Sequence, residues 1–171
     1  TLHPEFAFLP RKFKIAISAN ATDRAAILAH DVGIELKRYD QDVVADVYVG
    51  GGLGRTPIIG SLLKANLPAE DLISYLEAVV RVYNQFGRRD NKYKARIKIL
   101  AKAMGVEAFG AKVDAQWDLK KQSELQITES ELARVSSCFS APDYQSVDSQ
   151  VPAELEARLN ENRLFARWFE K

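Results

Sequence analysis

A run of β-branched residues that ends directly in three glycines is the feature that most constrains this chain. Residues Val43–Val49 are rich in valine, and Gly50, Gly51 and Gly52 follow without a break. β-Branched residues favour strands, and consecutive glycines permit backbone conformations that other residues avoid. The N–H groups of such a bend can converge on a phosphate or a carboxylate, whereas a plain hairpin turn is the alternative. The sequence therefore predicts a strand that leads into a tight bend, and that bend is a candidate anion site.

A basic segment upstream supplies positive charge. Residues 9–14 read Leu-Pro-Arg-Lys-Phe-Lys, and from Lys12 to Ile17 apolar and other residues alternate. This period of two predicts a half-buried strand over residues 12–18, with Phe13, Ile15 and Ile17 on its apolar face. Lys12 and Lys14 would then share the other face, either as solvated lysines or around a bound anion. The basic strand and the glycine bend together favour a site for a polyanion.

The glycine spacing excludes the two common phosphate-binding fingerprints. Counting from Gly50 or Gly52, the last glycine of G-x-G-x-x-G would fall on Arg55 or Pro57. The sequence also lacks G-x-x-x-x-G-K-[ST], so neither a dinucleotide site nor a P-loop is predicted. Arg55 itself, just after the glycines, favours an anionic ligand.

Three apolar stripes with helical spacing follow the bend. They predict one helix from about Pro68 to Gly87, a second from about Asn91 to the C-cap glycine Gly105, and a third through Trp117. A short helix is expected around residues 24–30, and further strands over residues 32–36 and 43–49. The predicted fold class is α+β, with a mixed sheet flanked by helices.

Several of these motifs, in this order, resemble the sirohaem-dependent nitrite and sulfite reductase family. They are the LPRKFK segment, Val32-Gly-Ile34, Val47-Tyr-Val-Gly-Gly-Gly-Leu53, Gly87-Arg-Arg-Asp-Asn91 and Lys94-Ala-Arg96. The resemblance covers residues 9–117, and it implies a sirohaem/4Fe-4S domain fold. It also implies six-electron reduction of sulfite to sulfide, or of nitrite to ammonia, with electrons from ferredoxin or a flavoprotein.

The resemblance implies roles for particular residues. Lys12 and Lys14 would be catalytic, because they would meet the substrate anion and donate protons. The implied cofactor-binding residues are Arg11, Gly50, Gly51, Gly52, Arg55, Arg88, Arg89 and Arg96. Sirohaem carries many carboxylates, and arginine presents a planar fork that suits a carboxylate.

The cysteine content differs from the family pattern. The family holds its 4Fe-4S cluster with four cysteine thiolates, whereas this chain has a single cysteine, Cys138. We therefore expect no metal site, and an isolated chain that is inactive and binds neither cofactor. It would be part of a longer reductase, whose remainder would be its partner. A non-catalytic module that binds an anion or a nucleotide is the alternative.

Composition and the end of the chain complete the predictions. With 24 basic and 23 acidic residues the formal charge is +1, which argues against a general nucleic-acid or membrane partner. No apolar stretch approaches the length of a membrane span, so a cytoplasmic location is expected. Residues 1–119 are predicted to form the sirohaem-facing domain and the Ser-rich residues 120–152 a linker. Residues 153–171 resemble the start of the family's second, repeated half.

Overall fold

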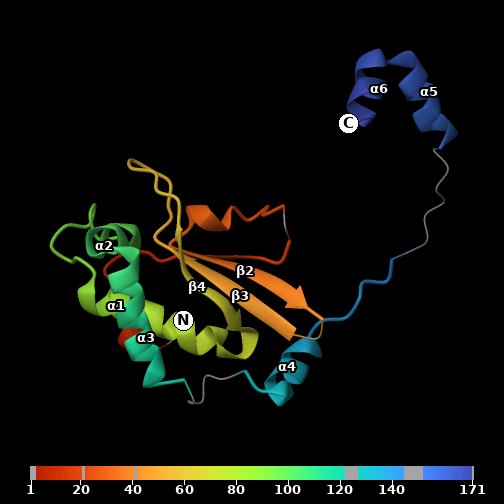
Figure 1. The fold of residues 1–171 in the computed structure, drawn as a ribbon. Coiled ribbons are helices and arrows are strands. Elements are labelled where there is room, and N and C mark those ends of the chain that lie inside the picture. The colour runs from red at the N-terminus through yellow and green to blue at the C-terminus, as the bar shows by residue number, and fades with distance from the viewer. Residues whose placement is uncertain (1–2, 21, 41, 122–126, 145–151, 171) are drawn as a thin grey trace. The chain divides into compact units, whose positions relative to one another are not determined.

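The described part of the chain forms two compact units, residues 1–134 and residues 135–171. The computed structural model describes residues 3–20, 22–40, 42–121, 127–144 and 152–170. Figure 1 shows the fold, and the 3-10 helices, which it does not label, are named η in the text. In chain order they are η1 (Pro4–Phe6), β1 (Ile15–Ser18), η2 (Ile27–Ala29), β2 (Val32–Tyr39), β3 (Asp42–Val49), β4 (Ser61–Pro68), η3 (Ala69–Asp71), α1 (Leu72–Phe86), α2 (Ile97–Met104), α3 (Val106–Asp118), α4 (Glu129–Ser136), α5 (Ala153–Glu161) and α6 (Arg163–Phe169).

A mixed sheet with the order β1-β2-β3-β4 organises the first unit. β1 runs parallel to β2, with Ile15 beside Val32, while β2, β3 and β4 are antiparallel to one another. The register of β3 against β4 shifts on either side of Val47, which marks a bulge in this pair. The sheet and its helices confirm the predicted α+β class.

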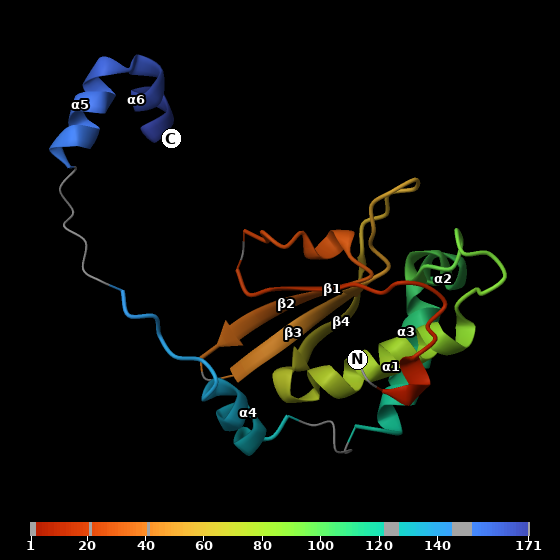
Figure 2. The ribbon, with the colours of Figure 1, turned by 180° about the vertical axis from the view of Figure 1, so that it is seen from behind.

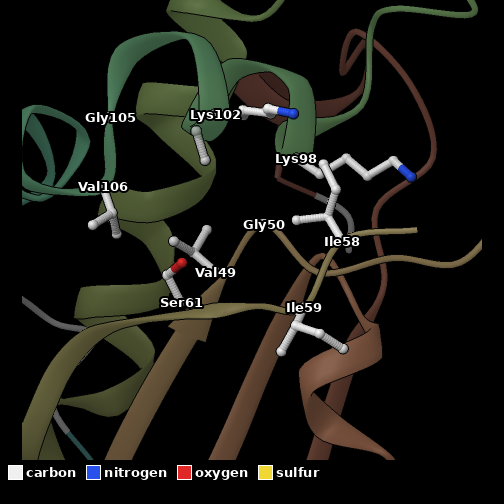
Figure 3. A pocket seen from close by; sticks show the side chains of 10 residues that line it. Val49, Gly50, Ile58, Ile59, Ser61, Lys98, Lys102, Gly105 and Val106 are labelled. Carbon is white, nitrogen blue, oxygen red and sulfur yellow. The ribbon is translucent and has the colours of Figure 1, made fainter. Parts of the chain in front are cut away.

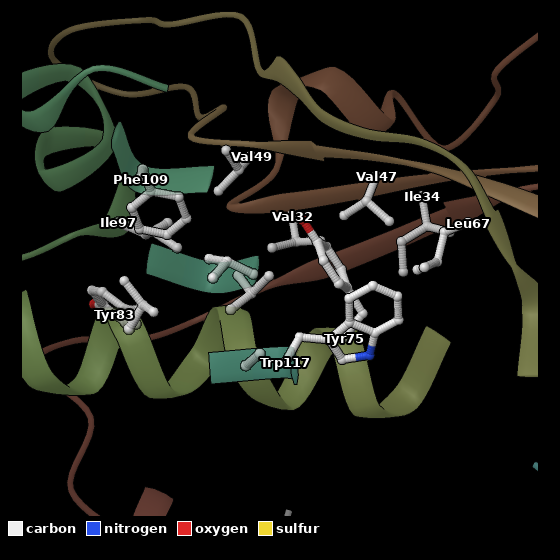
Figure 4. Close-up of a cluster of buried hydrophobic side chains, with 14 of the residues drawn as sticks. Val32, Ile34, Val47, Val49, Leu67, Tyr75, Tyr83, Ile97, Phe109 and Trp117 are labelled. Carbon is white, nitrogen blue, oxygen red and sulfur yellow. The ribbon is translucent and has the colours of Figure 1, made fainter. Parts of the chain in front are cut away.

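Helices α1 and α3 cover one face of the sheet, as the two opposite views show (Figures 1 and 2). The core lies in this layer, because alternate residues of β2 and β3 point into it and the apolar stripes of α1 and α3 meet them. Figure 4 shows the cluster, in which Tyr75, Trp117 and Phe109 pack against valines and Leu67 of the sheet. The stripes predicted from helical spacing are therefore core, as expected.

The opposite face is covered in part by the connection from β1 to β2, which contains η2 (Figure 2). Two glycines allow this close approach. A Cβ at Gly33 would lie 2.4 Å from the carbonyl oxygen of Ile27, and one at Gly51 would lie 2.1 Å from that of Leu28. Neither position can hold a side chain without moving the backbone.

Several predicted details of this unit were wrong. Ile15 and Ile17 are 44% and 54% exposed, because β1 lies at the border of the described sheet, beyond the cover of the helices. β1 begins at Ile15 rather than Lys12, and η2 replaces the short helix expected over residues 24–30. The second helix begins at Ile97 rather than near Asn91, and β4 was not predicted at all.

The second unit contains a pair of short helices, α5 and α6. The two helices are separated at Asn162, whose side chain accepts hydrogen bonds from the backbone N–H groups of Leu164 and Phe165 at 3.1 and 3.0 Å. This is an N-cap, so α6 starts anew. Within the predicted linker, residues 129–136 form α4, while residues 122–126 and 145–151 lie outside the described residues. No helix in the described segments is long and apolar enough to cross a membrane.

Candidate functional site

A buried carboxylate, that of Asp31, joins three segments of the candidate site. Its Oδ1 accepts hydrogen bonds from Nε and Nη2 of Arg96 at 3.0 and 2.7 Å, and its Oδ2 accepts one from the backbone N–H of Lys14 at 3.1 Å. The side chain of Asp31 is fully buried, and that of Arg96 is 16% exposed. The ion pair between them is therefore largely withdrawn from solvent.

The same residue also holds the glycine bend. The main-chain oxygen of Asp31 accepts a hydrogen bond from the N–H of Gly50 at 2.9 Å, and Asp31 directly precedes β2. Next to it, the N–H of Val32 donates to the carbonyl oxygen of Lys14 at 3.1 Å, which begins the parallel pairing of β1 with β2. Lys14, Gly50 and Arg96 are thus brought together, although they are far apart in the sequence.

The amides of the glycine bend are used inside the protein. The N–H of Gly50 donates to Asp31, and the N–H of Gly52 donates to the carbonyl oxygen of Ile58 at 2.9 Å. Gly50, Gly51 and Gly52 are all buried, and Gly50 has φ of 82°, which favours glycine. The expectation that these N–H groups form an open anion cradle was therefore wrong for Gly50 and Gly52. This also removes the main argument for a nucleotide-binding module.

Lys98, on α2, holds the loop that follows the glycines. Its ammonium donates to the carbonyl oxygen of Thr56 at 2.6 Å and lies 3.4 and 3.5 Å from those of Leu53 and Gly52. The residue is only 7% exposed. Burial lowers the pKa of Lys98, the nearby charge of Arg96 lowers it further, and Asp31 acts in the opposite direction. Lys98 therefore acts as a clamp on residues 52–56.

A cavity of 330 Å³ lies beside the bend, between α2 and the strands (Figure 3). Its lining is mainly apolar, and two lysines of α2, Lys98 and Lys102, contribute to it. The other main lining residues are Val49, Gly50, Ile58, Ile59 and Val106. An apolar pocket with a few charged groups is the usual form of a site for a small molecule.

The two lysines predicted to be catalytic are exposed. Lys12 and Lys14 flank Phe13, whose ring packs against that of Tyr83 with centroids 5.7 Å apart. Phe13 thus anchors the segment, and the lysines on either side of it face solvent. Neither ammonium has a hydrogen-bond or ion-pair partner within the described residues. The same holds for the guanidinium of Arg55, which lies in the exposed loop after the bend.

The remaining predicted arginines have partners within the chain. Arg11 donates to the carbonyl oxygen of Lys92 and lies over the ring of Tyr93, with its Cζ 5.9 Å from the centroid. Arg88 forms an exposed ion pair with Asp90 at 2.5 Å. The guanidinium of Arg89 donates hydrogen bonds to the backbone oxygen of Asn84 at 2.7 Å and to that of Phe8 at 3.2 Å. These three arginines do not contact Asp31.

Asp31 and Lys98 belong to this site but were not predicted from the sequence. Asp31 carries no recognisable spacing, and its only signal is an acidic residue immediately before a buried strand. Lys98 follows Ile97 on an amphipathic helix, where a lysine is normally solvated. Only the tertiary structure shows that both are buried.

Among the described residues, no group of three or more His, Cys, Asp or Glu side chains is placed to hold a metal ion. The single cysteine, Cys138, is exposed and belongs to the second unit. A 4Fe-4S cluster needs four thiolates, so the residues of this chain alone do not fit that cluster.

Comparison with known proteins gives consistent matches. The family described as "Nitrite and sulphite reductase 4Fe-4S domain" matches residues 1–121. A sulfite reductase [ferredoxin] of Mycolicibacterium paratuberculosis is 34% identical over 63% of this chain and 19% of its own length. The beta subunit of sulfite reductase [NADPH] from Saccharomyces cerevisiae is 35% identical over 68% of this chain and 9% of its own length.

A solved structure agrees with these matches. The NirA protein of Mycobacterium tuberculosis superposes with a TM-score of 0.61 and 31% identity, covering 68% of this chain and 21% of that protein. This chain thus spans about a tenth to a fifth of the relatives that it matches. Because the family match extends over residues 1–121, well over half of the chain, we conclude that the chain belongs to the nitrite and sulphite reductase 4Fe-4S domain family.

Proposed function

We propose that this chain supplies the substrate-facing wall of a sirohaem-dependent sulfite reductase, with Lys12 and Lys14 as the residues that meet the anion. The single observation that carries this proposal is the joining of Lys14, Gly50 and Arg96 through Asp31. Sulfite is preferred to nitrite because the curated relatives described above are named sulfite reductases. The activity belongs to the longer protein, and the isolated chain is expected to be inactive.

The two lysines suit this role because their ammonium groups are exposed beside a rigid frame. Each ammonium offers several N–H donors to the oxygens of a bound anion. A lysine next to the reacting anion can also act as a general acid, which typically contributes about 10²- to 10⁴-fold to a rate. Phe13, packed against Tyr83, fixes the backbone between them.

Sirohaem, when bound, supplies the iron at which the anion is reduced. Its carboxylates need cations, and Arg55 is the predicted arginine that keeps its guanidinium unpaired among the described residues. Arg11, Arg88 and Arg89 would have to exchange or share their present partners, while Arg96 keeps two donors on Asp31. Gly50, Gly51 and Gly52 would contribute to the cradle through shape rather than through their amides, because a Cβ at these positions would collide with Ala101, Leu28 or Arg96 and displace the bend.

The test is the substitution of each lysine in the complete, cofactor-loaded protein. We expect Lys12→Ala and Lys14→Ala to lower sulfite turnover by at least about tenfold, with the sirohaem absorbance per protein unchanged. Lys14→Arg keeps the charge but cannot give up a proton, so it should retain sulfite binding and lose turnover. Lys112→Ala, which removes an exposed lysine from α3, is the matched control. Wild-type turnover in the variants of Lys12 and Lys14 would overturn the proposal.

A further inference from the structure

Asp31 uses each of its three oxygens for a different segment of the site. Oδ1 holds the guanidinium of Arg96, Oδ2 holds the backbone N–H of Lys14, and the main-chain oxygen holds the N–H of Gly50. The side chain has no exposed surface. A buried carboxylate is tolerated when its oxygens are satisfied in this way, and a change at this position would affect all three segments.

The orientation of Arg96 depends on this carboxylate. Nε and Nη2 of Arg96 share Oδ1 of Asp31, so the plane of the guanidinium is fixed by two hydrogen bonds. Its Nη2 also lies 3.1 Å from the point where a Cβ of Gly52 would be. The guanidinium therefore packs directly against the glycine bend. Its position there requires both the carboxylate of Asp31 and a glycine at position 52.

We propose that Asp31 is the positioning residue of the anion site, which sets Lys14 and Arg96 against the glycine bend without touching the anion itself. This inference rests on the proposed function. It also gives Arg96 a different role from the one that the resemblance implies, because the charge of Arg96 is largely compensated by Asp31. Arg96 belongs to the frame, and Lys12 and Lys14 offer the anion positive charge that no carboxylate among the described residues compensates.

The substitution Asp31→Asn separates positioning from charge. A carboxylate offers two acceptor oxygens, one for Arg96 and one for Lys14, whereas an amide offers a single oxygen and two donors. One of the two partners must therefore face an N–H group. If Asp31 acted only through its negative charge, removing that charge near a cationic site would tighten anion binding. If Asp31 positions the site, the same substitution weakens anion binding. The sign of the change decides between them.

The experiment measures sulfite binding to the complete, cofactor-loaded protein from the change in sirohaem absorbance. We expect Asp31→Asn to raise the dissociation constant for sulfite about 10- to 100-fold, the size of effect that accompanies the loss of a hydrogen bond to a charged group. Hydrogen–deuterium exchange should speed up in the peptides that contain Lys14 and Gly50. Glu5→Gln is the matched control, because Glu5 also holds a buried arginine, Arg81, by two hydrogen bonds at 2.8 Å. It should lower the melting temperature and leave sulfite binding unchanged.

The outcomes distinguish this inference from the proposed function. Equal or tighter sulfite binding in Asp31→Asn, with weaker binding in Lys14→Ala, would overturn the positioning role alone. Unchanged binding in Lys14→Ala would overturn the proposed function. If Asp31→Asn does not fold, Asp31→Glu retains both oxygens on a side chain that is one methylene longer. It should fold and still weaken sulfite binding, and wild-type affinity in that variant would refute the positioning role.

Discussion

The hydroxyl of Tyr75 offers a direct test of the packing in the core. Tyr75 is fully buried on α1, and its ring meets that of Trp117 edge to face, with centroids 5.3 Å apart. Its hydroxyl has no hydrogen-bond partner among the described residues. The pKa of Tyr75 is raised, first by burial and second by the nearby carboxylate of Asp114. The carboxylate of Asp114 lies nearby but outside hydrogen-bond geometry, so we expect the buried hydroxyl to destabilise the folded state.

We expect Tyr75→Phe to stabilise the protein. A buried polar group without a partner costs about 1 to 3 kcal/mol, whereas the void left by one oxygen atom costs only a few tenths, at about 24 cal/mol per Å³. The net gain in the free energy of unfolding should be about 1 kcal/mol. For a chain of this size that corresponds to a rise in melting temperature of about 2–4 °C.

Thermal unfolding followed by circular dichroism at neutral pH measures this difference, and Tyr83→Phe is the matched control. Tyr83 is equally buried on the same helix, but its hydroxyl donates to the carbonyl oxygen of Ala95 at 2.9 Å. Removing that hydroxyl leaves a buried carbonyl oxygen without its donor, so Tyr83→Phe should lower stability by about 1 kcal/mol. If Tyr75→Phe also lowers stability, the hydroxyl of Tyr75 has an acceptor, and the reasoning is wrong.

Three further predictions concern the stability of the protein and the loop of residues 52–56. Glu5→Gln should lower the free energy of unfolding at neutral pH by less than about 1 kcal/mol, since Glu5 is partly exposed. The hydrogen bonds from Arg81 lower the pKa of Glu5, so its contribution is present above the usual carboxyl pKa of 4.5. It should vanish as acid protonates the folded carboxylate, and a difference that persists in strong acid would contradict this. Gly51→Ala should cost about 3 kcal/mol in urea unfolding, because its Cβ would lie 2.1 Å from a carbonyl oxygen. Lys98→Met should accelerate trypsin cleavage within residues 52–56 while changing global stability by only about 1 kcal/mol, and an unchanged cleavage rate would exclude the clamp.

Periodicity in the sequence predicted the elements that pack a regular series of apolar residues against the core. The apolar residues of β2 and β3 that meet the helices alternate along each strand, and α1 shows its stripe because one side of it packs against the core. β4 was missed because only Leu67 of its eight residues is buried. Ile15 was assigned to the apolar face of a half-buried strand because a strand pattern does not show where the helical cover ends.

The site was less predictable than the fold. Lys12, Lys14 and the glycines could be proposed from motifs, because charge and missing side chains are visible in a sequence. The contacts of Arg96 and Lys98 could not, since they depend on groups dozens of residues away, such as the carboxylate of Asp31 and the carbonyl oxygen of Thr56. The sequence likewise does not show that the N–H of Gly50 is already satisfied by a main-chain oxygen.

The contact between η2 and the sheet has an unequal effect on tolerance to mutation. The groups that lie too close to a Cβ at Gly51 are main-chain atoms of Leu28 and His30, not their side chains. Every amino acid carries such main-chain atoms, so Leu28 can be replaced by many other residues, whereas position 51 accepts only glycine. Saturation mutagenesis should therefore find many acceptable residues at Leu28 and almost none at Gly51.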